Sequence, residues 1–242
     1  MELKQSIDYK IINKIGKGGF GEVYLIEKDN KYYALKKFNY ILTKEQKDKY
    51  NNILKILLKI NNENIIKYYY SFEEKGVFNL LMEYGGDNNL KQFIKNNKNN
   101  NKYIEEKIIK DIIIQICSGL KEIHKNNLIH RDLTPDNIFI DKNNKIKIWD
   151  FGISKIIENN GYANTIIGKH HYFAPEIEKG NKFNNKIDIY SLGCLIYELF
   201  TLNEYYIDTK IEGKNGQINL EKYEQKWQDL INLLLILRRY II

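Results

Sequence analysis

The residues best suited to chemistry lie in one block, which reads His-Arg-Asp-Leu-Thr-Pro-Asp-Asn from His130 to Asn137. Two short alternating apolar runs follow this block and predict an antiparallel hairpin, whose pairing brings Asn137 and Asp150 together at one end. Amide and carboxylate oxygens suit Mg²⁺, which can hold triphosphate oxygens at the same time. Asp132, five residues before Asn137, is placed to accept the proton of an attacking hydroxyl group.

A glycine cluster near the N-terminus has the composition of a phosphate-binding loop. It follows the pattern Gly-x-Gly-x-x-Gly from Gly16 to Gly21, which on its own also fits dinucleotide-binding folds. A dinucleotide site would open into a helix, whereas the residues after Gly21 alternate as a strand. The loop is therefore expected to cap a hairpin, where glycine lets backbone N–H groups approach phosphate oxygens. Taken alone, the cluster also fits a merely flexible turn.

A cation follows on the strand after the glycine hairpin. Lys36 shares a strand face with Ala34, so a small residue and an ammonium group point the same way. Ala34 suits a position above the adenine of a nucleotide, and Lys36 suits a cation that binds its phosphates. A single strand lysine is more often solvated, so the interpretation depends on the block around Asp132.

A sheet, a hairpin and several helices must bring these residues together. Strands are predicted over 9–15, 22–27, 32–38, 64–72 and 77–84. A helix is predicted over 43–60, between the third and the fourth strand, and further helices over 104–123, 188–200 and 227–237. The helix over 104–123 is apolar nearly all round, which predicts a buried helix. The Asn/Lys run over 96–102 is expected to be a solvated loop.

Taken together, the blocks resemble the eukaryotic protein kinase family over nearly the whole chain from Tyr9, and a faint likeness to NIMA-related kinases leaves the subfamily open. The resemblance implies an α+β, bilobal protein kinase fold. Residues 1–84 would form an N-lobe of antiparallel sheet plus one main helix, and residues 85–242 a mostly helical C-lobe. It also implies a serine/threonine kinase in signalling, a transferase that uses ATP and Mg²⁺ to phosphorylate protein substrates.

The resemblance assigns site residues by position. The catalytic set would be Asp132 as base, Lys36 on the phosphates, Asn137, Thr134 and Lys169. The metal ligands would be Asn137 and Asp150. The nucleotide would lie against Ile15, Gly16, Lys17, Gly18, Gly19, Phe20, Gly21, Val23, Ala34, Lys36, Met82, Glu83, Tyr84 and Phe139. Among these, Met82 would be the gatekeeper, and the backbone of Glu83 and Tyr84 would face adenine.

The resemblance also identifies residues that would hold the fold and the catalytic loop in place rather than take part in the reaction. His130, Phe151, Leu57 and Tyr68 would stack as a regulatory spine, although plain core packing explains these residues equally well. Asp188 resembles the buried aspartate that anchors the catalytic loop. Glu176, in Ala-Pro-Glu, would close the activation segment and pair with Arg238 or Arg239.

The chain departs from the family pattern at three places. The helix position that normally supplies a glutamate to Lys36 falls on Ile53, which predicts activity reduced about ten- to a hundred-fold unless another contact replaces it. Thr134 and Lys169 look exchanged, and we interpret Lys169 as approaching Asp132 from the opposite side; drift of both residues in a poorly active enzyme is the alternative. The stretch over 201–225 is too short for the helix that usually follows, which puts substrate docking there in doubt.

Regulation is expected at the activation segment. Arg131, next to the proposed base, implies a basic pocket for an anion from that segment. Thr165 resembles the primary phosphorylation position, with Tyr162 as the lesser candidate. Phosphorylated Thr165, produced by an upstream kinase or by autophosphorylation, is predicted to pair with Arg131 and order the segment.

Composition limits the other function classes. The chain has 242 residues, 43% of them apolar, and a formal net charge of +7, which suits one domain or two small lobes. Because lysine is spread along the chain among acids, we favour a solvated surface over specific nucleic-acid binding. Cys117 and Cys194 stand far apart in apolar segments, which predicts buried thiols of an intracellular, cytoplasmic protein. No apolar run is long enough to span a bilayer.

Two other functions stay open at this point. A weakly active or inactive pseudokinase, acting as a nucleotide-binding signalling scaffold, is the runner-up, and Ile53 is its main support. A basic RNA- or membrane-binding module rests on charge alone. The two prolines of the chain, Pro135 and Pro175, both fall inside kinase motifs, which favours the kinase fold over this third function.

Overall fold

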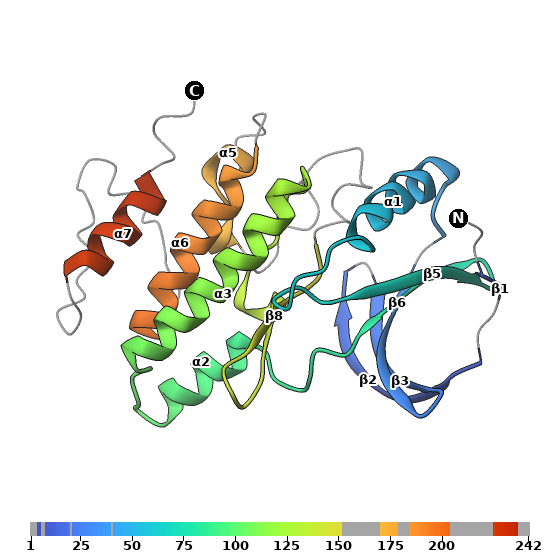
Figure 1. Ribbon diagram of the computed structural model, residues 1–242, viewed down its shortest axis with the longest axis horizontal. Coiled ribbons are helices and arrows are strands. Elements are labelled where there is room, and N and C mark those ends of the chain that lie inside the picture. The colour runs from blue at the N-terminus through green and yellow to red at the C-terminus, as the bar shows by residue number, and fades with distance from the viewer. Residues whose placement is uncertain are drawn as a thin grey trace.

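The computed structural model describes residues 4–5, 8–19, 21–39, 41–151, 170–178, 184–203 and 225–236. Figure 1 shows a sheet with one helix at one end of the molecule and the remaining helices at the other. This is the α+β, two-lobed architecture that the sequence predicted. Within the described part of the chain, none of the helices is both long and apolar enough to cross a membrane.

The N-terminal lobe is built on a six-stranded sheet of order β1-β5-β6-β4-β3-β2. Its strands are β1 (Lys4–Gln5), β2 (Lys10–Gly18), β3 (Gly21–Lys28), β4 (Lys31–Phe38), β5 (Tyr68–Glu74) and β6 (Val77–Glu83). β1 pairs in parallel with β5, and the other neighbours are antiparallel. Gly21 is required by close packing, because a Cβ there would lie 2.2 Å from the carbonyl oxygen of Lys37.

One helix, α1 (Lys44–Leu57), accompanies the sheet. It begins at Thr43 with a capping box: the Thr43 hydroxyl accepts from the Gln46 amide at 3.2 Å, and the Gln46 side chain accepts from the Thr43 amide at 2.9 Å. Tyr50, Leu54 and Leu57 follow the helical period and are buried. The helix predicted over 43–60 is confirmed at this place.

The C-terminal lobe is mostly helical, as predicted. Its helices are α2 (Leu90–Asn99), α3 (Glu106–Lys125), α5 (Pro175–Glu178), α6 (Lys186–Thr201) and α7 (Gln225–Ile236), with short 3₁₀ turns η1 (Pro135–Asn137) and η2 (His170–Tyr172). α6 contacts both α3 and α7, and the three lie side by side in Figure 1. α6 is buried along most of its length because its residues are predominantly apolar.

Three expectations about this lobe are wrong, and one of them is that the helix over 104–123 is buried nearly all round, because α3 buries one face only. The run over 96–102 is not all loop, because α2 continues to Asn99; its capping box at Asn89 and the buried Leu90 and Ile94 outweigh the low helix propensity of asparagine. Cys117 is exposed rather than buried, while Cys194 is buried as expected. The reason is that α3 is amphipathic: its buried residues follow one helical face, and Ile114 on the other face is 56% exposed.

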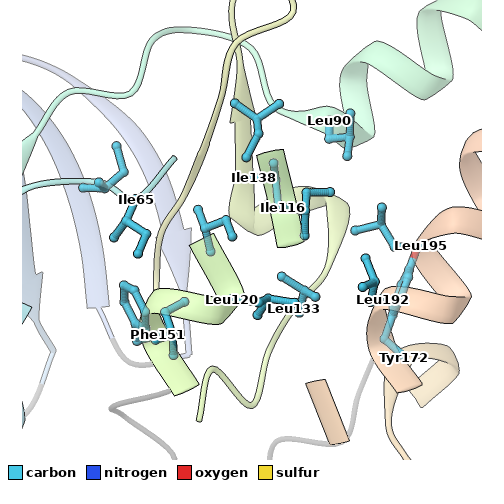
Figure 2. Close-up of a cluster of buried hydrophobic side chains, with 14 of the residues drawn as sticks. Ile65, Leu90, Ile116, Leu120, Leu133, Ile138, Phe151, Tyr172, Leu192 and Leu195 are labelled. Carbon is cyan, nitrogen blue, oxygen red and sulfur yellow. The ribbon is translucent and has the colours of Figure 1, made fainter. Parts of the chain in front are cut away.

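A continuous core joins the two lobes. Figure 2 shows Ile65 of the N-terminal lobe and Phe151 beside Leu120 of α3, and Leu195 of α6 lies in the same cluster. A second, smaller cluster contains Ile26, Leu35, Phe72 and Leu81. Since the main core is shared, the elements that frame the space between sheet and helices are held by common packing.

Candidate active site

A cavity of about 560 Å³ lies between the glycine hairpin and the catalytic block. This volume is within the range of pockets that hold small-molecule ligands. Predicted site residues that line it are Ile15, Gly16, Lys17, Gly18, Gly19, Gly21, Val23, Ala34, Lys36, Met82, Glu83, Tyr84, Asp132, Asn137, Phe139 and Asp150. The cavity thus brings the glycine block, the strand lysine and the catalytic block into one site.

The roof of the cavity leaves room under two glycines. A Cβ added at Gly18 would meet nothing within 4 Å, and one at Gly16 would meet only Val23, at 3.6 Å. Packing of the protein alone therefore does not require glycine at these two positions. Unfilled space beside two glycines that line the cavity fits the close approach of a phosphate chain.

The floor comes from the hairpin β7 (Ile138–Ile140) and β8 (Ile146–Ile148), in which Ile138 pairs with Ile148 as predicted. Phe139 lies against the segment after β6. A Cβ at Gly85 would be 2.2 Å from the Phe139 ring, so glycine is required there for the ring to reach this place. A planar ring thus lines the same cavity as Val23 and Ala34.

The segment at the back of the cavity is fixed by Glu83. Its backbone N–H donates to the Lys67 carbonyl at 2.8 Å, so this amide is engaged within the lobe. Its carboxylate accepts from the Lys67 amide at 3.1 Å and pairs with the Lys147 ammonium at 3.1 Å. Because Lys147 lies on β8, this ion pair connects the two lobes directly at the cavity.

Asp132 and Asn137 are in direct contact. The Asn137 side-chain amide donates to the Asp132 backbone carbonyl and to its carboxylate oxygen Oδ2, both at 2.8 Å. Pro135 begins the short turn η1 that ends at Asn137, a position that suits its fixed φ. Because the amide nitrogen faces Asp132, the amide oxygen points away from it. Thr134 is fully buried beside this turn.

Asp188 anchors the catalytic block, as predicted. Its carboxylate, 1% exposed, accepts from the backbone amides of His130 and Arg131, each at 2.9 Å. His124 contacts the same carboxylate through Nε2 at 2.7 Å. Arg131 has φ +65°, and Asp150 has φ +52°; such left-handed backbone is uncommon outside glycine and gathers at functional sites.

Lys36 has a partner that the sequence did not reveal. Its ammonium group lies 2.5 Å from the Asp150 carboxylate, and the residue is 8% exposed. Ile53, at the position where a glutamate was sought, is half-buried and packs against the main core. The strand cation and the predicted metal ligand therefore form an ion pair.

Phe151 lies between two rings. Its centroid is 5.2 Å from that of His130 and 5.8 Å from that of Tyr68, and Leu57 is buried in the same cluster. Burial raises the pKa of Tyr68. Three residues of the predicted stack, His130, Phe151 and Tyr68, thus lie side by side, and Leu57 belongs to the same main core.

His130 is held in its neutral form at the centre of the block. Burial lowers the pKa of His130, and this effect outweighs the neighbouring carboxylates. Its Nε2 lies 2.9 Å from the Trp149 carbonyl, while Nδ1 lies 3.3 Å from the Asp132 amide. A neutral ring with a proton on Nε2 satisfies both contacts, because one nitrogen then donates and the other accepts.

Several lining residues were not found from the sequence, namely Ile66, Gly86, Asp87, Asn89, Gln92, Asp136, Trp149 and Phe173. For Trp149 a signal was present, because strand alternation places it on the same hairpin face as Phe139. Other predicted positions lie outside the described residues: Phe20, Thr165, Lys169, Tyr162, Arg238 and Arg239.

Most of the chain matches known proteins. The family model described as protein kinase domain matches residues 9–234. The chain is 35% identical over 223 residues to the probable serine/threonine-protein kinase nek2 of Dictyostelium discoideum, covering 89% of this chain and 53% of that protein. It is 36% identical over 198 residues to Nek3 of Mus musculus, covering 81% and 38%. It is also 36% identical over 214 residues to Nek5 of Homo sapiens, covering 86% and 29%. The chain spans about half or less of the length of these relatives.

Proposed function

The chain belongs to the eukaryotic protein kinase family, with NIMA-related serine/threonine kinases among its relatives, and on that premise we propose that its cleft transfers the γ-phosphate of ATP to serine or threonine hydroxyls of proteins. The observation that carries the proposal is the meeting of Asp132, Asn137, Asp150 and Lys36 around one cavity beneath a glycine hairpin. A base, two oxygen ligands and a cation at one place are the parts that phosphoryl transfer requires.

Each residue has a distinct role in this proposal. Asp132 accepts the proton of the substrate hydroxyl while the oxygen of that hydroxyl attacks the γ-phosphorus of ATP. The bond between the γ-phosphorus and the oxygen that bridges it to the β-phosphate breaks, and ADP leaves. The Asn137 amide holds Oδ2 of Asp132 at 2.8 Å, which fixes the direction of the carboxylate. Lys36 offsets phosphate charge. A Mg²⁺ ion held by Asn137 and Asp150 would neutralise charge on the phosphate oxygens.

The cavity also suggests how the nucleotide lies. The adenine base of ATP would rest between Val23 and Ala34 on one side and Phe139 on the other. Met82 and the backbone of Glu83 and Tyr84 would lie at its edge. The phosphates would lie beneath residues 15–21 of the glycine hairpin, which include Phe20. The unfilled space at Gly16 and Gly18 supports this direction.

Several finer parts belong to the same proposal. We assign 1–84 to the N-lobe and 85–242 to the C-lobe, with an intracellular, cytoplasmic location and no specific nucleic-acid partner. Two free thiols, Cys117 and Cys194, support a reducing compartment. Phosphorylation of Thr165, by an upstream kinase or by the protein itself, would produce an anion for Arg131. Lys169 would supply a cation beside Asp132 and Thr134.

A weakly active or inactive nucleotide-binding scaffold is the second candidate. It is favoured by Ile53, which packs into the core instead of offering an acid to Lys36. It is also favoured by the Lys36–Asp150 ion pair, because that contact must open or be shared before either group meets a phosphate or a metal. Activity below that of the relatives is the expected consequence.

A transfer assay separates the two candidates. Purified protein is incubated with ATP labelled on the γ-phosphate, Mg²⁺ and a mixed serine/threonine acceptor, with the Asp132→Asn variant as comparison. The kinase predicts incorporation that falls about a hundred-fold or more in Asp132→Asn, while ATP binding is kept. Equal background incorporation by both proteins, with ATP still bound, would instead support the scaffold.

A further inference from the structure

Trp149 lies directly before Asp150, and the roles proposed above leave it unassigned. Its side chain lines the main cavity and also a small cavity behind Lys36. We propose that Trp149 is a further nucleotide-contact residue, the second of two aromatic rings on which the base and sugar of the nucleotide rest. The inference rests on the proposed nucleotide site and adds a residue to it.

The first step is that Trp149 and Phe139 form one platform. Phe139 pairs with Lys147 in the β7–β8 hairpin, and residue 149 shares the face of residue 147. The two ring centroids lie 5.3 Å apart, with 32° between the planes. The rings are tilted relative to each other and close enough to form an aromatic pair, and both residues line the cavity.

The second step is that the ring is held in place. The Trp149 backbone N–H donates to the Asn137 carbonyl at 3.1 Å, and its carbonyl lies 2.9 Å from Nε2 of His130. The indole N–H points toward the Asp136 carbonyl at 3.4 Å. The contacts of the indole with Asp136 and Phe139 restrict the side chain before a ligand arrives, so packing of a ligand on it costs less entropy.

The third step is that Trp149 packs against the edge of the main core and is only partly buried. Its neighbours Ile146 and Ile148 are 1% and 0% exposed and point into the main core, whereas Trp149 is half-buried on the opposite face of the hairpin. A large aromatic ring turned toward a cavity offers stacking area to a planar ligand. Stacking of a base on an aromatic side chain is energetically substantial.

The chain makes the test unusually direct because it contains two tryptophans, Trp149 and Trp227. Trp227 lies on α7, 7% exposed, with its ring 5.1 Å from that of Phe200 and its indole N–H donating to Glu106 at 2.8 Å. It is not among the residues that line the cavity. Fluorescence of two single-tryptophan variants can therefore be assigned residue by residue.

The experiment titrates Mg·ATP into wild type, Trp227→Phe and Trp149→Phe while tryptophan emission is recorded. We expect the nucleotide-dependent change in emission to persist in Trp227→Phe and to vanish in Trp149→Phe. A change that survives in Trp149→Phe at wild-type size, or no change in Trp227→Phe although ATP binds, would overturn the proposal. The Trp227→Phe measurement uses the native Trp149, so it does not depend on a substitution in the cleft.

Equilibrium dialysis with labelled ATP supplies the affinity. We expect Trp149→Ala to bind ATP about five- to a hundred-fold more weakly than wild type, with Trp149→Phe in between. An unchanged ATP affinity in Trp149→Ala would show that Trp149 does not contact the nucleotide. Tighter ATP binding would show that the indole occupies the place of the adenine base. If wild type itself retains no ATP in dialysis, the nucleotide site and this inference both fail; retention by wild type with no effect of Trp149→Ala rejects the inference alone.

Discussion

Asn137 donates its side-chain amide to both the backbone carbonyl and the carboxylate of Asp132, at 2.8 Å each. One residue thereby fixes the carboxylate proposed as base and presents its own amide oxygen on the other side. The two proposed tasks, proton acceptance and metal binding, are therefore coupled through one side chain. A change at Asn137 should disturb both.

We predict that Asn137→Ala lowers kcat about a hundred-fold and raises the Mg²⁺ concentration required for half-maximal transfer. The physical reason is that the variant loses a proposed metal ligand and a hydrogen bond that orients the Asp132 carboxylate. The measurement is transfer rate against Mg²⁺ concentration. Asn143→Ala is the matched control, because Asn143 is an exposed residue of the β7–β8 turn that uses its backbone N–H toward Asp141. An unchanged Mg²⁺ requirement in Asn137→Ala would contradict its role as a ligand.

A second prediction concerns the buried carboxylate of Asp188. Asp188→Ala leaves the amides of His130 and Arg131 without their acceptor, and it removes a partner of His124. We expect the free energy of unfolding to fall by about 3 kcal/mol, as for the loss of charged hydrogen bonds in a buried site. Urea unfolding measures this quantity. Asp111→Ala, on the exposed face of α3, should change it by less than about 0.5 kcal/mol; equal effects of the two variants would mean that Asp188 is no anchor.

Local pattern was sufficient for much of the fold. Alternation at β3 and β4, helical period in α1 and the pairing of Ile138 with Ile148 follow from side-chain direction, which is a property of short segments. Asp188 was found because a motif spans it. These successes share a cause: each depends on residues close together in the chain.

The sequence-based predictions failed where the outcome depends on contacts between segments that lie far apart in the sequence. The partner of Lys36 is Asp150, 114 positions away, and spacing along α1 carried no information about it. The exposure of Cys117 depends on which face of α3 the other elements cover, and an isoleucine-rich helix does not reveal that face. Trp149 was not identified from the sequence, although its contact with Phe139 follows from the same register that was predicted.

A third prediction contrasts two glycines of the cleft. Gly85→Ala drives a methyl group to within 2.2 Å of the Phe139 ring, so we expect a loss of about 1–3 kcal/mol in the free energy of unfolding. Gly18→Ala meets nothing within 4 Å and should cost less than about 1 kcal/mol, while ATP binding weakens because the methyl group occupies phosphate space. Urea unfolding and ATP dialysis on both variants test the contrast. Full ATP affinity in Gly18→Ala would show that the phosphates do not lie beneath this hairpin.

The last prediction is a pH dependence that arises from His130. Burial lowers the pKa of His130 in the folded protein below its ordinary value, so between these two pKa values the unfolded chain binds a proton that the folded chain refuses. The contribution of His130 to stability is therefore complete above about pH 6.5, the ordinary value for histidine, and declines as the pH falls below it. His130→Phe keeps an aromatic ring beside Phe151 but cannot take up a proton, so its stability should fall less steeply between pH 7.5 and pH 5. Urea unfolding of both proteins over this range gives the two slopes. Other titrating groups contribute equally to both, so parallel curves would show that His130 does not remain neutral in the folded protein.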